Sequence, residues 1–278
     1  MYEKSNEFSW DLGSNVEFIS NISHELRTPL NNILSAEQLL ALNIKDVCNI
    51  SRSQTNFIKY LGSIEHNSYR LQRIIDNFIN ITDIQLGLCK LNLKNYDIIH
   101  LIKTITKHVG NFAHRKGIDI ILLTNAFEKK MAFDKVKLEK VILNLLSNAI
   151  KYSENNKTIK IVIFDKNDSV LIKVIDQGIG IPNEKLSGIF DVFVQVDKSF
   201  NRSREGAGTG LAIAKSFVEL HKGTITVLSS ETQGSEFKIE LPVSTIAENE
   251  MRIMDDEEGN MIHKIEIEFS DIYEITSC

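Results

Sequence analysis

The sequence predicts a helical hairpin that dimerises into a four-helix bundle, followed by an α+β two-layer sandwich. Apolar residues recur at helical spacing through two long stretches before residue 88, and strand and helix patterns alternate from about residue 91 onwards. The length of 278 residues suffices for about two domains. We therefore expect a polar N-terminal lead at 1–13, the hairpin at 14–88, the sandwich at 91–242 and an acidic C-terminal extension at 243–278.

The first helix is expected to run from about Ser14 to Leu42. One face of this helix carries apolar residues, namely Phe18, Ile22, Leu26, Ile33 and Leu40. The opposite face is polar and contains His24, Thr28, Asn31 and Ser35. A histidine on a polar face is either a plain solvated residue or a reactive group. The reactive interpretation is favoured because Glu25 follows directly, Thr28 lies one turn on, and Pro29 interrupts the helix.

The second helix is expected at about Gln54 to Leu86. Its apolar residues fit a heptad seam that Ser68 interrupts: Phe57, Leu61, Ile64, Leu71, Ile75 and Phe78. Two helices of roughly 30 residues are each about 45 Å long and share too little core to be stable alone. We therefore expect a homodimer with a four-helix bundle.

The second domain begins with a strand-like segment at 95–99 and a helical segment that reaches about Lys116. Further strands are expected at 117–123, 158–164, 170–175, 223–228 and 236–241, and further helices at 135–152 and 209–221. This order favours a mostly antiparallel sheet covered by helices over a doubly wound parallel sheet.

The C-terminal extension starts with an acidic run at 255–258 and then alternates Ile265, Ile267 and Phe269 in the manner of a strand. An extra edge strand or a loosely attached tail is the favoured interpretation, ahead of a specific regulatory role.

Bulk composition excludes several classes of protein. With 42% hydrophobic and 25% charged residues, the chain has an ordinary globular composition, and a net charge of -5 argues against a nucleic-acid partner. Cys48, Cys89 and Cys278 show no metal-ligand or disulfide spacing, so a reducing, cytoplasmic setting is expected. No apolar run near 18 residues and no signal-peptide pattern is found, so we expect no membrane span.

The helix expected at 135–152 carries Asn144, Asn148 and Lys151 together on one face. Two carboxamides and an amine can serve phosphate groups and a hydrated cation, and Mg²⁺ is suited to one amide oxygen with phosphate oxygens and waters. The alternative is a merely solvated helix face.

Three further segments have the chemistry of a nucleotide site. Asp176 ends an apolar strand and can accept a hydrogen bond from the adenine amine, while Gly178 and Gly180 permit a close backbone approach, although this pattern alone also fits a turn. Phe190 and Phe193 precede a polar loop with Lys198, Arg202 and Arg204, and on composition alone these phenylalanines are core residues. The loop enters Gly206-Ala-Gly-Thr-Gly-Leu, where a helix N-terminus can meet phosphate.

Residues 18–30 read Phe-Ile-Ser-Asn-Ile-Ser-His-Glu-Leu-Arg-Thr-Pro-Leu, which resembles the phosphoacceptor box of sensor histidine kinases. Four segments resemble the family's other boxes in the same order: 144–153 its asparagine box, 176–181 its first glycine box, 190–193 its phenylalanine box and 206–211 its second glycine box. Thr209 stands where many relatives have leucine or another small residue. The resemblance spans about residues 15–242 and implies a sandwich of the Bergerat or GHKL ATPase type. A Walker loop and the serine-kinase signatures are both missing.

The resemblance implies an ATP-dependent protein histidine kinase that uses ATP and Mg²⁺. His24 would take the γ-phosphoryl group and pass it to an aspartate of a response regulator, with Glu25 holding the imidazole tautomer and Thr28 serving a phosphatase activity. Thr28 is as easily explained as a tolerated polar residue. Asn148 would hold the metal. The implied ATP-binding residues are Asn144, Asn148, Lys151, Tyr152, Asp176, Gly178, Gly180, Ile181, Phe190, Phe193, Lys198, Arg202, Arg204, Gly206, Gly208, Thr209, Gly210 and Leu211.

Two other functions compete with this one. A non-kinase ATPase of the same superfamily would use the hairpin only to dimerise and would hydrolyse ATP without labelling the protein. A degenerate kinase would dock partners without chemistry, although every catalytic box is filled. The lead before Ser14 is too short for a recognisable sensor domain, so we expect a separate sensor partner or a sensorless form.

Overall fold

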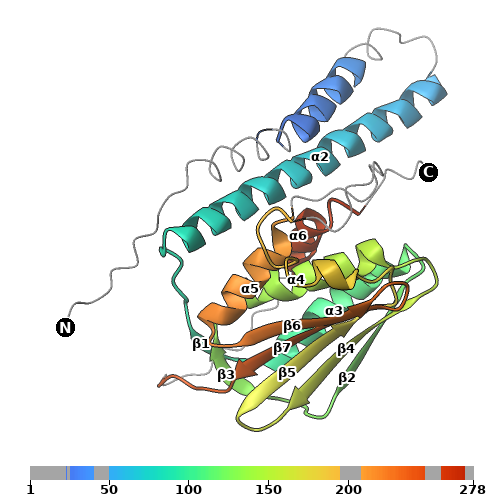
Figure 1. Cartoon of the computed structure of the whole chain (residues 1–278). Helices are drawn as coiled ribbons and strands as arrows, with labels where there is room; N and C mark the ends of the chain where they lie inside the picture. Colours follow the sequence, from blue (N-terminus) through green and yellow to red (C-terminus); the bar gives the residue numbers. More distant parts are fainter. Residues whose placement is uncertain (1–22, 24–25, 41–49, 195–207, 248–257, 273–278) are drawn as a thin grey trace. The chain divides into compact units, whose positions relative to one another are not determined.

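The computed structural model describes residues 23, 26–40, 50–194, 208–247 and 258–272. The chain divides into two compact units, residues 1–74 and 75–278, and helix α2 (Ile50–Gln85) spans the boundary. In the first unit, residues 26–40 form a helix that pairs with α2 in a hairpin (Figure 1). Asn32 Nδ2 donates a hydrogen bond to Oδ1 of the buried Asn67, 3.2 Å away, and so links the two helices. The expected helical hairpin is confirmed.

The hairpin buries only part of its apolar surface. Ala36 and Leu40 are buried, whereas a set of large apolar side chains on both helices is exposed: Leu30, Leu34, Leu39, Phe57, Ile58 and Leu61. Three of the predicted seam residues, Phe57, Leu61 and Ile75, are more than 40% exposed in the single chain. An isolated hairpin thus lacks a sufficient core, as the sequence predicts.

A five-stranded sheet forms one layer of the second unit, with the order β2-β4-β5-β7-β6. β2 pairs with β4 in parallel, and the other neighbours are antiparallel. The mostly antiparallel sheet is therefore confirmed. The strand bounds are β2 Asp119–Thr124, β4 Thr158–Asp165, β5 Ser169–Ile175, β6 Thr224–Ser230 and β7 Gly234–Pro242. A separate two-stranded sheet joins β1 (Lys94–Asp97) to β3 (Lys130–Phe133), and the sequence patterns did not indicate β3.

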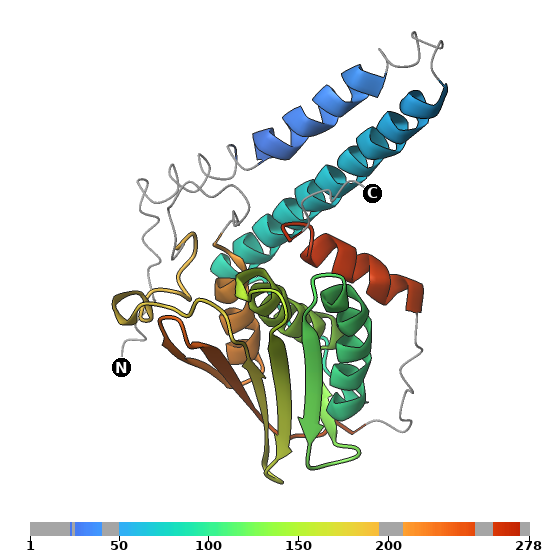
Figure 2. The same cartoon turned by 90° about the vertical axis from the view of Figure 1, so that its right-hand side faces the viewer.

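Helices α3 (Ile98–His114), α4 (Lys135–Tyr152) and α5 (Gly210–Leu220) form the second layer on one face of the sheet (Figures 1 and 2). Alternate strand residues such as Ile159, Ile161 and Ile163 are fully buried, because every second side chain points at the helices. α4 occupies the residues that its apolar periodicity predicts. A single 3₁₀ turn, η1 (Asn183–Lys185), follows the strand β5.

The C-terminal extension differs from expectation. Residues Glu258–Glu268 form helix α6 where the alternating pattern predicted an edge strand or a loose tail. Met261, Ile265 and Phe269 recur every four residues and are buried, and Ile267 is buried beside them. A broad apolar helix face can mimic strand alternation over so short a stretch, which explains the error. Figure 2 shows α6 beside α3 and α4, and both helices contact it.

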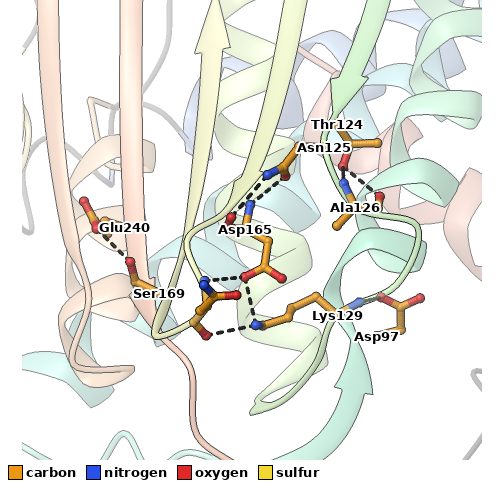
Figure 3. A network of polar contacts seen from close by, with 9 residues as sticks. Asp97, Thr124, Asn125, Ala126, Lys129, Asp165, Ser169 and Glu240 are labelled. Carbon is orange, nitrogen blue, oxygen red and sulfur yellow. Dashed lines mark hydrogen bonds and ion pairs between the residues drawn. The ribbon is translucent and has the colours of Figure 1, made fainter.

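A polar network around Asp165 links strand ends and turns of the second unit (Figure 3). Lys129 Nζ lies 2.8 Å from an Asp165 carboxylate oxygen, and the Lys129 backbone N–H donates to Asp97 Oδ1 at 3.0 Å. The hydrogen bond from Lys129 lowers the pKa of Asp165. The side chain of Asn125 accepts from the Asp165 N–H at 2.8 Å and donates to the Asp165 carbonyl at 3.2 Å. The network therefore joins the ends of β2 and β4.

Candidate functional site

Helix α4 provides the frame of the site, and both of its ends are held. At its start, Asp134 accepts a hydrogen bond from the Lys137 N–H at 3.1 Å, and His221, just after α5, accepts one from the Asp134 N–H at 3.0 Å. Burial lowers the pKa of His221, which favours the neutral imidazole that accepts this hydrogen bond. At the other end, Lys116 Nζ donates to the Ile150 carbonyl at 2.5 Å, so a cation meets the negative end of the helix dipole. α4 is thus fixed along its axis.

Asp176 directly follows β5 and is 6% exposed. Its Oδ1 atom accepts backbone hydrogen bonds from Gly178 at 2.9 Å and from Ser235 at 3.1 Å. Burial raises the pKa of Asp176, and the two hydrogen bonds oppose that shift. Both hydrogen bonds end on Oδ1, so Oδ2 remains to accept a bond from a ligand.

The segment after Asp176, residues 177–181, contacts the end of α4 and the end of β6. The Ile179 N–H donates to the Tyr152 carbonyl at 3.3 Å, and the Ile181 N–H donates to Ser229 Oγ at 2.9 Å. Gly180 has a φ of +70°, and a Cβ there would lie 1.9 Å from the Ser230 carbonyl oxygen. No other residue can take this position without moving the backbone. The structure therefore places Gly178 beside Tyr152 at the end of α4, and Gly180 and Ile181 against Ser230 and Ser229 of β6.

Two turns earlier on α4, Asn144 lies against the start of α5. It is 2% exposed, and its Nδ2 atom is buried with no hydrogen-bond partner. Its Oδ1 atom would lie 2.6 Å from a Cβ at Gly210, so this glycine permits a close approach of the two helices. Asn148 is half-buried between these two points, and Lys151 is buried with its Nζ 5.6 Å from the centre of the Tyr152 ring. α4 thus contacts both glycine-containing segments, about 12 Å apart along its axis.

Thr209 precedes α5 without capping it. Its side chain makes no hydrogen bond to the first turn of the helix, and its Oγ1 instead accepts from Asn77 Nδ2 at 3.1 Å. Both residues are buried and belong to the second unit. Because the first N–H groups of α5 lack a side-chain cap, they are able to meet an anion. Leu211 follows in the first turn and is half-buried.

The polar loop that carries Lys198, Arg202 and Arg204, which we name the lid, joins two segments that contact each other. The Phe193 N–H donates to the Gly208 carbonyl at 3.0 Å, and Lys215 of α5 lies with its Nζ 5.9 Å from the centre of the Phe190 ring. The residues between these segments, which include Lys198, Arg202, Arg204 and Gly206, lie outside the described residues. In the hairpin, Thr28 is exposed, as its polar face predicts, while His24 and Glu25 also lie outside the described residues.

Two residues that shape the site were not predicted from the sequence. Ser229 holds the segment after Asp176 through the Ile181 N–H, and its hydroxyl oxygen lies 2.9 Å from that of Ser235. Asn77 holds Thr209 from 132 positions away in the chain. Serines in strands carry no distinctive pattern, and a contact over that separation has no local signal. Only the polar Asn77 within an apolar helix stretch could have drawn attention.

Two family models match the chain. Residues 14–87 match the His Kinase A (phospho-acceptor) domain, and residues 133–245 match the Histidine kinase-, DNA gyrase B-, and HSP90-like ATPase. The chain belongs to the histidine kinase family. This histidine kinase therefore has the two expected parts, a phosphoacceptor domain followed by an ATPase-type sandwich.

Individual relatives agree with this assignment. The kinase is 34% identical to hybrid signal transduction histidine kinase D of Dictyostelium discoideum over 88% of its own length and 16% of that protein. It is 30% identical to the autoinducer 2 sensor kinase/phosphatase LuxQ of Vibrio vulnificus over 82% of its length and 26% of that protein. Its fold resembles that of full-length ShkA in complex with AMPPNP, with a TM-score of 0.61, 26% identity, and coverage of 84% of this chain and 47% of ShkA.

This kinase spans less than a third of the length of either curated relative. Among its described helices, none combines the length and apolar character needed to cross a bilayer.

Proposed function

We propose that this chain autophosphorylates His24 with ATP and Mg²⁺ and passes the phosphoryl group to an aspartate of a response regulator. One observation carries the proposal most strongly: a phosphoacceptor box and a buried Asp176 framed by α4 occur in the same chain. The family assignment and the resemblance to ShkA, whose structure holds the ATP analogue AMPPNP, support nucleotide binding by the second unit.

The residues present fit an adenine nucleotide. Asp176 offers a buried carboxylate oxygen, Oδ2, that can accept a hydrogen bond from the exocyclic amine of adenine. Gly178 and Gly180 let the backbone after Asp176 pack closely against the carbonyls of Tyr152 and Ser230, which holds the Asp176 segment in place. The orphaned Nδ2 atom of Asn144 is a buried donor without a partner, which is costly unless a ligand oxygen accepts from it. Beside Asn144, two turns before the end of α4, the first N–H groups of α5 can meet phosphate.

The chemistry of the donor set also fits Mg²⁺. Asn148 offers one amide oxygen, and phosphate oxygens and waters would complete the octahedral shell that this ion prefers. Bound there, the ion would neutralise charge on the phosphates. Lys151 beside it, with Lys198, Arg202 and Arg204 of the lid, would bind the remaining phosphate charge.

The transfer step follows from the chemistry of imidazole. His24 Nε2 attacks the γ-phosphorus of ATP, a P–N bond forms, and the bond from that phosphorus to the β–γ bridging oxygen breaks, so ADP leaves with the electron pair. Glu25 accepts the hydrogen bond from Nδ1–H and stabilises the positive charge that develops on the ring. The same arrangement keeps Nε2 unprotonated for the attack.

Phosphatase activity toward the regulator is the second part of the proposal. Thr28 lies one turn after His24 and is exposed, so its hydroxyl can orient a water molecule against a phosphoaspartate. The relative LuxQ is named a sensor kinase/phosphatase, which agrees with both activities in one chain.

We further propose a homodimer. The exposed apolar side chains of the hairpin, including Leu34, Phe57 and Leu61, need a partner of matching chemistry, and a second copy of the hairpin supplies one.

The decisive experiment incubates the purified protein with Mg²⁺ and γ-labelled ATP and compares wild type with His24→Gln. His100→Gln serves as a matched control, because His100 is exposed on α3. The proposal expects an acid-labile, base-stable label that disappears only in His24→Gln. ATP turnover without label would instead indicate the non-kinase ATPase.

A further inference from the structure

Helix α6 lies beyond residue 245, where the match to the ATPase family model ends, yet it is packed as tightly as the core of the second unit. Met261, Ile265 and Phe269 are each less than 8% exposed. The Phe269 ring meets the Phe112 ring of α3 edge to face, with ring centres 4.8 Å apart. The extension thus adds a helix to the face of α3 and α4.

Two crossed ion pairs join α6 to α4. Lys264 Nζ of α6 lies 2.6 Å from a carboxylate oxygen of Glu139 on α4. In the reverse sense, Lys140 of α4 pairs with Glu268 of α6. Glu139 and Glu268 are 1% and 2% exposed, so both carboxylates depend on these partners. Each helix contributes one lysine and one glutamate to the two ion pairs, so both pairs form only in one direction and one position of α6 along α4.

A third polar contact also joins α4 to α6. Ser147 Oγ, on the side of α4 that carries Lys140 two turns earlier, donates to the Glu268 carbonyl at 3.3 Å. The contacts from Glu139 to Ser147 therefore follow α4 through the turn that contains Asn144.

α4 is consequently held by contacts with two other helices. A Cβ at Gly210 of α5 would lie 2.6 Å from Asn144 Oδ1, so Asn144 is packed closely against α5. Lys140 and Ser147, one turn before and one turn after Asn144, both contact Glu268 of α6. A movement of the turn around Asn144 therefore disturbs contacts with both α5 and α6.

We infer that α6 is a positioning element for the proposed ATP site, which holds α4 so that Asn144, Asn148 and Lys151 face the nucleotide. The inference rests on the proposed function. α6 itself touches no nucleotide and acts through α4, so its ion pairs determine how tightly ATP is bound and how rigid α4 is.

The test compares the same substitution at two positions of α6 in the full-length protein. Glu268→Lys reverses the buried charge that pairs with Lys140, whereas Glu266→Lys changes an exposed residue of the same helix. The affinity for MgATP is measured by calorimetry at a temperature where each variant is folded by circular dichroism. Hydrogen exchange of the α4 amides is measured without nucleotide.

We expect Glu268→Lys to weaken MgATP binding roughly 3- to 30-fold and to speed exchange in α4 around Asn144. Glu266→Lys should stay within about twofold of wild type, the size of a surface effect. The double variant Lys140→Glu with Glu268→Lys restores the ion pair in reverse and should recover most of the lost affinity, which a merely unfolded α6 would not do.

Equal binding and equal α4 exchange in wild type and Glu268→Lys would overturn the inference, as would equal losses in both single variants. If Glu268→Lys does not fold, Glu268→Gln and Glu266→Gln replace the pair under the same criteria. A wild-type protein that binds no ATP would count against the proposed function, while exchange in α4 would still decide whether α6 braces that helix.

Discussion

Replacement of Asp176 by Asn separates nucleotide recognition from folding. Asp176 Oδ1 accepts two backbone hydrogen bonds, from Gly178 and Ser235, and the amide oxygen of Asn can accept both in the same place. The other carboxylate oxygen becomes an NH₂ group, so the acceptor proposed for the adenine amine turns into a donor. Side-chain volume is nearly unchanged, and the local backbone should keep its course.

The loss in affinity follows from one hydrogen bond to a charged group. Such a bond contributes about 1.5–3 kcal/mol, and two donors that face each other recover none of it. We therefore expect MgATP to bind roughly 10- to 150-fold more weakly to Asp176→Asn.

The same substitution, Asp176→Asn, should weaken MgATP binding but leave the stability of the protein equal or higher. Burial raises the pKa of Asp176 above its unfolded value, so the folded state favours the protonated form. The resulting stabilisation is present below the unfolded pKa and is lost as pH rises through the folded pKa. Wherever the wild-type carboxylate is ionised, burial makes its charge unfavourable, and Asn removes that charge. The melting temperature without nucleotide should be equal or higher in the variant.

Calorimetric titration with MgATP and thermal unfolding without nucleotide measure the two effects. Asp168→Asn is a suitable control, because Asp168 is exposed at the opposite end of β5. Unchanged affinity in Asp176→Asn would refute the proposed contact with adenine. A markedly lower melting temperature would refute the argument that the two backbone hydrogen bonds survive and that the buried charge is unfavourable.

Two other substitutions test separate parts of the structure. Thr28→Ala should abolish dephosphorylation of the regulator while sparing autophosphorylation, because the hydroxyl is proposed to act only on the attacking water. A time course with labelled regulator distinguishes the two activities. Equal loss of both would contradict the phosphatase role of Thr28. Gly180→Ala should destabilise the second unit by at least about 2 kcal/mol, since its Cβ would lie 1.9 Å from the Ser230 carbonyl oxygen. Denaturant unfolding of Gly180→Ala measures this effect, and wild-type stability would show that the segment after Asp176 can move aside.

Local patterns predicted most of the second unit because its elements follow their own periodicity. The bounds of α4 agree with its sequence pattern because Asp134 caps the start and a broad apolar face runs through to Ile150. The strands β4 and β5 alternate cleanly because one face packs under helices. The prediction of an edge strand or loose tail at α6 was wrong because Ile265, Ile267 and Phe269 fit both a strand pattern and a wide helix face. The packing of α6 against α3 and α4 favours the helix.

The sequence indicated which residues belong to the candidate site, but not which of them contact one another. Asp176 and the glycines after it were singled out by their position after an apolar strand, and the structure places Gly178 against the end of α4 and Gly180 against β6. The contact between Asn144 and Gly210 depends on how two helices pack, and the Asn77 to Thr209 hydrogen bond depends on chain segments 132 residues apart. Neither relation has a local signature. Roles for His24, Glu25 and the lid cations stay predictions.

The side chain of Asn125 has a consequence for how the sheet is assembled. β2 and β4 are parallel neighbours with no hairpin between them, so no turn sets their register. A slip by one residue would turn every side chain of β2 to the wrong face. The Asn125 side chain bonds to both the N–H and the carbonyl of Asp165, 40 residues away, the two bonds that a residue of an antiparallel strand would make. These two hydrogen bonds form only in one alignment of β2 and β4. Pairing of such distant segments is a slow event in folding, and this amide makes the correct pairing selective when it occurs.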